Sequence, residues 1–254
     1  MATSQIGIIT IPVDGAWDIE DLRALSESLS ETYGLFYPLL AQDEATRERL
    51  QELIRKQFWS GDIATRHFGQ RLYRSVPNDE GLKLKSFRYA SPGIMELTGV
   101  LMVLLLLSRV ARSWIATGSA GIDLWKKVDA FFAKRKALRR PAKKFEMDDE
   151  LADNSDDARE LVYEAGKLLG FDGQTCNTLI NITGNPISAL KYLVAAANEA
   201  RKLADLQNRG LLTLPKSDEP ISIQGPQTLQ RRTGGGVAVE KSPRRRRVKP
   251  PEDE

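Results

Sequence analysis

The spacing of hydrophobic residues in the N-terminal part of the chain predicts one strand followed by two helices. Residues 6–13 (IGIITIPV) form a short β-branched run, which predicts a strand. Pro12 cannot donate a ladder hydrogen bond, so we expect this strand either to lie at a sheet edge or to end there. From Ile19 to Leu40, leucines and aromatic residues recur every three or four positions, which predicts a helix capped by Asp18. A second helix is predicted from Glu44 to Phe58.

The loop 77–81 (PNDEG) separates two short hydrophobic stretches, residues 70–76 and 82–90. Its composition is typical of a hairpin, and leucines alternate with lysines in the second stretch. Together with the first strand, these stretches predict a three-stranded sheet with helices on one face. The first stretch has an alternative, because Phe68, Leu72 and Tyr73 would also suit the end of a helix. Ser91-Pro92-Gly93 is expected to begin a helix that contains the apolar run Leu97–Ser108.

The rest of the chain is predicted to be helical as far as residue 215. We expect 118–121 (GSAG) to end one helix, and further helices over 122–140, 158–169, 175–183 and 187–209. Beyond them the chain has too few apolar residues to offset the entropy of ordering, which predicts disorder. The predicted fold class is therefore α+β, with a small three-stranded sheet and helices at the N-terminus, then a helical C-terminal module and a disordered tail.

Changes of composition suggest five segments. They are an α+β domain (1–92), an apolar helix plus a basic amphipathic helix (93–141), an acidic linker (142–156), a helical module (157–215) and a disordered basic tail (216–254).

Charge is unevenly distributed, although the formal net charge is only +3. Between Arg109 and Lys144 the chain has eleven Lys and Arg residues and two Asp residues, whereas the segment Glu146–Asp157 has seven acidic residues and no basic one. We expect the acidic segment either to be a solvated linker or to fold back on the basic segment before it.

The basic helix predicted over 122–140 is the candidate docking site. Its apolar side holds Ile122, Trp125, Val128, Phe131 and Phe132, and its charged side holds Lys126, Lys127, Lys134, Arg135, Lys136, Arg139 and Arg140. This pattern is typical of a helix in an anionic membrane interface or in the groove of an acidic protein. A surface helix that packs its apolar side on its own domain has the same pattern.

The apolar run Leu97–Ser108 covers twelve residues, or about 18 Å of helix, against a hydrocarbon core of about 30 Å. A buried core helix is therefore favoured over a membrane span. The four arginines of the tail, Arg244, Arg245, Arg246 and Arg247, suggest nonspecific contact with nucleic acid as an alternative function.

The sequence favours a protein without catalytic activity, and it predicts no cofactor and no metal site. His67 is the one histidine and Cys176 the one cysteine; we expect His67 to be a partly buried structural residue and Cys176 a small core residue. The acidic segment lacks the glycine turn and the spacing of a calcium loop. An enzyme that uses Asp or Glu carboxylates remains a further alternative.

One cysteine excludes an internal disulfide, and the first ten residues lack the features of a secretory signal. We therefore expect a cytoplasmic protein. If the basic helix docks on a membrane, the protein would lie at the inner membrane. Unpaired strand edges can pair with another copy of the chain, so the sequence is also compatible with a homo-oligomer.

The order of a strand, a helix with Trp17 near its start, a second strand and then Tyr89-Ala90-Ser91-Pro92-Gly93 resembles a loose group of uncharacterised bacterial α+β proteins. The resemblance covers Ile6–Val110. It implies a bacterial protein of the accessory or regulatory kind, and no activity, substrate or catalytic residue.

Overall fold

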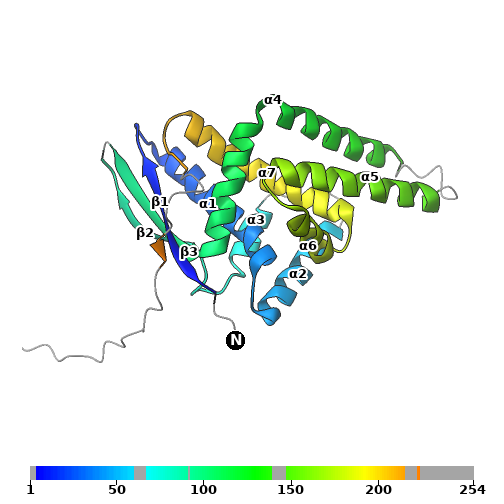
Figure 1. Cartoon of the computed structure of the whole chain (residues 1–254), viewed down its shortest axis with the longest axis horizontal. Coiled ribbons are helices and arrows are strands. Elements are labelled where there is room, and N and C mark those ends of the chain that lie inside the picture. Colours follow the sequence, from blue (N-terminus) through cyan, green and yellow to red (C-terminus); the bar gives the residue numbers. More distant parts are fainter. Residues whose placement is uncertain (1–3, 60–66, 91, 139–146, 215–221, 224–254) are drawn as a thin grey trace, which may run out of the picture. The chain divides into compact units, whose positions relative to one another are not determined.

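A small antiparallel sheet and a group of helices make up the described part of the chain (Figure 1). The computed structural model describes residues 4–59, 67–90, 92–138, 147–214 and 222–223, which belong to one compact unit, Met1–Gln224. The elements are β1 (Ile6–Val13), α1 (Ile19–Leu40), α2 (Glu44–Trp59), α3 (Phe68–Tyr73), β2 (Lys83–Arg88), β3 (Gly93–Val100), α4 (Leu101–Leu138), α5 (Met147–Leu168), α6 (Gly173–Thr183), α7 (Pro186–Asn208) and β4 (Ser222–Ile223). The predicted α+β fold class is confirmed.

The sheet has the order β2-β3-β1-β4, and its neighbouring strands are antiparallel. β1 lies inside the sheet, which corrects the expectation of an edge strand, and it ends at Val13, directly after Pro12, as the alternative predicted. The carbonyl of Pro12 accepts a hydrogen bond from the Thr213 N–H at 2.9 Å. Since the nitrogen and the carbonyl of one residue point to the same side of a strand, the missing N–H faces residues 211–214 and not β3. Within the predicted tail, Ser222 and Ile223 pair with Ile8 and Gly7 as β4.

The first arm of the predicted hairpin is a helix, α3, and not a strand. Phe68 and Leu72 are four residues apart and both are buried, so the helical spacing prevails over the hairpin-like loop that follows. α3 packs closely on α1: a Cβ on Gly69 would lie 2.5 Å from the Glu31 carbonyl oxygen, and only glycine fits there.

The segment after Ser91-Pro92-Gly93 begins as a strand, and the helix starts only at Leu101. Within β3, Met95 and Leu97 are buried while Ile94 is exposed, which is the alternation of a strand with one inward face. The apolar run 97–108 therefore crosses a strand–helix boundary, which uninterrupted hydrophobicity conceals. Its helical part is a core helix, as predicted, because Val103, Leu104 and Leu107 are buried. No helix among the described residues meets the length and apolarity needed to cross a bilayer.

α4 continues through 118–121, where the sequence predicted an interruption. Figure 1 shows that the helix changes direction part-way along its length, and its only two glycines, Gly118 and Gly121, lie in that part of the sequence. Glycine and serine pairs are common at helix bends. The first half of α4 packs with α1 beside the sheet, and the second half runs beside α5 (Figure 1).

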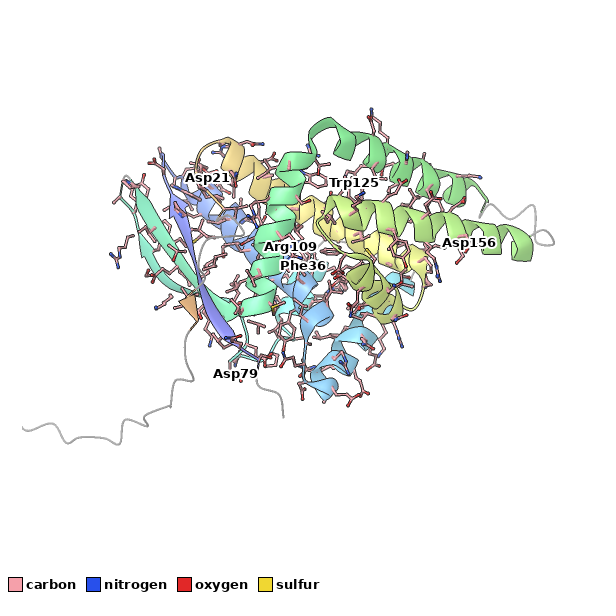
Figure 2. The ribbon with its side chains drawn as sticks, in the orientation of Figure 1. Asp21, Phe36, Asp79, Arg109, Trp125 and Asp156 are labelled. Carbon is pink, nitrogen blue, oxygen red and sulfur yellow. The ribbon has the colours of Figure 1, made fainter. Side chains whose placement is uncertain are left out.

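One hydrophobic cluster joins the sheet, α1 and the C-terminal helices. Phe36, near the centre of Figure 2, is fully buried and meets Phe171 edge-to-face at 5.9 Å between ring centroids. The hydroxyl of Tyr192 in α7 donates to the Leu35 carbonyl in α1. α5 begins at Met147, so the described part of the predicted acidic linker is helical. The five proposed segment boundaries themselves stay a prediction.

Candidate functional site

The second half of α4 contains the candidate docking residues, and its apolar side packs against the protein. Val128 is fully buried, and Trp125, Phe131 and Phe132 are half-buried against the core cluster. The rings of Phe131 and Phe132 meet edge-to-face at 5.5 Å. The remaining predicted residues are not described: Arg139, Arg140 and Arg244–Arg247 lie outside the described residues, as do the side chains of Ile122, Arg135 and Lys136.

Three lysines form the described charged side of this helix, and we call them the lysine face: Lys126, Lys127 and Lys134. All three are exposed. Lys126 Nζ lies 3.2 Å from Asp123 Oδ1 within α4, and Lys127 Nζ lies 3.5 Å from Glu164 Oε2 of α5. Two of the three lysines, Lys126 and Lys127, therefore lie close to carboxylates of their own chain.

A shallow groove of about 450 Å³ separates α4 from α5. Lys127, Phe131 and Lys134 line it from α4, and α5 contributes Asp157, Glu160, Leu161 and Glu164. The two helices lie side by side (Figure 1). Only Asp157 among these residues belongs to the acidic segment Glu146–Asp157, so the expected folding of that segment onto the basic one stays a prediction.

A larger groove of about 630 Å³ lies between α4 and α7, and we call it the tryptophan groove. Trp114 and Trp125 line it from α4, with ring centroids 5.9 Å apart and planes tilted by 39°. α7 contributes the small side chains Ala197 and Ala204. Figure 2 marks Trp125 near the bend of α4. The indole N–H of Trp125 is buried and has no acceptor among the described residues.

Charged and amide side chains surround the tryptophan groove. They are Lys126 and Asp129 from α4, and Asn198, Arg201, Asp205 and Asn208 from α7. Arg201 and Asp205 are exposed, and neither forms an ion pair with another described residue. Only Trp125 and Lys126 of this groove belong to the predicted docking site. The sequence did not indicate the others, since a spacing pattern within one helix carries no information about which second helix faces it.

A carboxyl cluster between α1 and α7 was also missed by sequence reasoning. Glu31 and Glu199 are both buried, and Lys202 Nζ lies 2.7 Å from Glu199 Oε1. Burial, and next the negative charge of Glu199, raise the pKa of Glu31. His67 Nδ1 lies 3.7 Å from Glu31 Oε1. In the described part of the chain, no group of three or more His, Cys, Asp or Glu side chains is placed to hold a metal ion.

The two candidate catalytic residue types lie apart and in different surroundings. The side chain of His67 is 66% exposed, which corrects the expectation of a partly buried residue. Its backbone has a positive φ of 58°, which is unusual for a residue other than glycine. Cys176 is buried in α6, as predicted, and burial raises the pKa of its thiol to about 11. It is a protonated core residue at neutral pH, and not a thiolate nucleophile.

Comparison with protein-family models, with curated proteins and with solved structures found no match to this chain. The resemblance to a bacterial group therefore stays a prediction.

Proposed function

We propose that this protein is a non-catalytic interaction protein that docks on an acidic protein partner through the lysine face. The observation that carries the proposal is that Lys126, Lys127 and Lys134 are exposed along one helix whose aromatic side packs inward. Exposed charges at the edge of an interface attract a complementary partner and raise the association rate.

The packing of the apolar side favours an acidic protein over a membrane surface. An interfacial helix binds lipid by burying its apolar side at the boundary of the acyl chains, and electrostatic attraction adds to this. Val128 is buried within the protein, and Phe131 and Phe132 pack against its core. Because Val128 is fully buried and Phe131 and Phe132 are half-buried, less apolar area is left for lipid, and charge is the main feature that the helix offers to a partner.

The ion pairs of the lysine face do not prevent such docking. Lys126 and Asp123 are both 73% exposed, and Lys127 and Glu164 are 64% and 40% exposed. Exposed ion pairs contribute little to stability because water and salt screen them. Carboxylates of a partner can therefore replace Asp123 and Glu164 at little cost in free energy.

Binding to poly-L-glutamate, a model acidic polymer, tests the proposal by titration calorimetry at low and at high salt. We expect binding at low salt that weakens as salt is added. Replacing all three lysines of the lysine face by glutamate should weaken binding by roughly tenfold or more.

The matched control replaces Lys56, Lys83 and Lys85 by glutamate, which changes the net charge equally on other elements. The proposal fails if the control weakens binding as much as the lysine-face variant does. Flotation of the full chain with anionic phosphatidylserine vesicles supplies a second outcome. Strong flotation that the lysine-face variant loses would assign the lysine face to a membrane surface and overturn the choice of an acidic protein.

A further inference from the structure

The tryptophan groove forms where the large side chains of one face of α4 lie opposite the small side chains of one face of α7. On α4, Trp114, Thr117, Gly121, Trp125 and Asp129 follow one another every three or four residues and line one side. On α7, the residues at the same spacing include Val194, Ala197 and Ala204. Because alanine and glycine leave room that the indoles do not fill, a concave space of about 630 Å³ remains. This volume lies within the range of small-molecule sites, roughly 300–1,000 Å³.

The wall of the groove suits an aromatic ring. Two indoles and the aliphatic side chains of Ile115 and Val194 line it. Trp114 and Trp125 are tilted against each other at 39° and are only half-buried, so part of their surface is open to a ligand. Aromatic rings pair with an indole in offset or edge-to-face arrangements, which adds to the energy of burial.

The rim of the groove suits a ligand that carries both charges. Lys126 and Arg201 are cationic, Asp129 and Asp205 are anionic, and they come from both helices. A purely anionic or purely cationic ligand would meet as many repelling as attracting groups. A zwitterion can place its carboxylate near Arg201, whose planar guanidinium suits a carboxylate, and its ammonium near an aspartate.

Exposed amide side chains suit an occupant with hydrogen-bonding capacity. Asn198 and Asn208 of α7 line the groove and are exposed. A carboxylate supplies acceptors and an ammonium supplies donors.

We propose that the tryptophan groove is a binding site for a small zwitterion with an aromatic ring, of the chemical class of the free aromatic amino acids. The ring packs on Trp114 and Trp125, Arg201 binds the carboxylate, and Asp129 or Asp205 binds the ammonium. The site is independent of docking through the lysine face, apart from Lys126, which belongs to both.

Titration of the full chain with L-phenylalanine tests the proposal, with protein tryptophan fluorescence and calorimetry as readouts. We expect saturable binding. N-acetyl-L-phenylalanine amide keeps the ring and lacks both charges, and L-leucine keeps both charges and lacks the ring. Each should bind roughly tenfold more weakly or worse. No saturable binding of L-phenylalanine, or equal binding of the uncharged analogue, would overturn the proposal.

Variants locate the site. Arg201→Ala should weaken binding of L-phenylalanine roughly tenfold, because it removes the partner of the carboxylate. Its matched control is Arg159→Ala, which removes an exposed arginine of α5 outside the groove. Trp125→Ala should also weaken binding, but this half-buried residue supports the fold, so Arg201→Ala and Asp129→Asn decide the result. If Arg201→Ala binds as wild type, or Arg159→Ala weakens binding equally, the assignment is wrong.

Discussion

Tyr33 holds the junction between β3 and α4, and Tyr33→Phe tests how much one hydroxyl contributes to it. The hydroxyl accepts a hydrogen bond from the Val100 N–H at 2.8 Å and donates one to the Glu80 carbonyl. Val100 is the last residue of β3 and is buried, so the variant leaves its N–H unpaired away from water. An unpaired buried group of this kind costs about 1–3 kcal/mol. Glu80, the acceptor of the second lost hydrogen bond, is half-buried in the loop before β2.

Urea denaturation of Tyr33→Phe should therefore show a free energy of unfolding lower by about 1–3 kcal/mol, with an unchanged dependence on urea concentration. Tyr89→Phe is the matched control. Tyr89 is 62% exposed, and its hydroxyl donates to the Gly15 carbonyl at 3.1 Å. That variant should change stability by less than about 0.5 kcal/mol. Equal effects of the two variants would refute the argument, because burial of the Val100 N–H would then carry no cost.

Three further predictions follow from close contacts elsewhere. Gly166→Ala should lower the free energy of unfolding by about 1–3 kcal/mol, because its new Cβ would overlap Cys176 Sγ. In urea denaturation, the double variant with Cys176→Ala should recover part of this loss. Strictly additive effects of the two substitutions would count against the overlap. The Cys176 thiol, with its pKa raised to about 11 by burial, should resist iodoacetamide at neutral pH until urea unfolds the chain; fast modification of the folded protein, followed by mass spectrometry, would contradict this. Arg209 donates two hydrogen bonds to Asp21, at 2.6 and 2.9 Å, which lower the pKa of that carboxyl. Their contribution to the free energy of unfolding is therefore fully present above the ordinary aspartate pKa of 3.8, and it is lost as the pH falls through the lowered pKa of Asp21. The stability difference between wild type and Arg209→Ala should therefore shrink in strong acid, and a constant difference across pH would disagree with this account.

The sequence predicted elements well where one spacing dominates and caps are clear. The helix from Ile19 to Leu40 has the predicted bounds, with Asp18 accepting the hydrogen bond of the Asp21 N–H at 2.8 Å. Prediction failed where local composition favoured two structures. Residues 97–108 are apolar throughout, so the end of β3 at Val100 left no mark in the hydrophobic pattern.

The candidate sites could be predicted only in part, since they depend on contacts between distant helices. Trp125 and Lys126 were recognised from the spacing within one helix. Arg201 lies more than seventy positions further along the chain and has no special local pattern. The pairing of Lys127 with Glu164 depends on α5 running beside α4, and Glu164 lies outside the acidic segment Glu146–Asp157 that the charge pattern indicated.

In the proposed function, α4 buries Val128 in the protein and offers its lysine face to a partner. Single cysteines test this directly on a Cys176→Ala background, which has no other cysteine. The rate of maleimide labelling should be high for Lys127→Cys and far lower for Val128→Cys, with the second rising only when urea unfolds the chain. Equal labelling rates at these neighbouring positions in the folded protein would contradict the claim, because the apolar side of α4 would then be open to solvent.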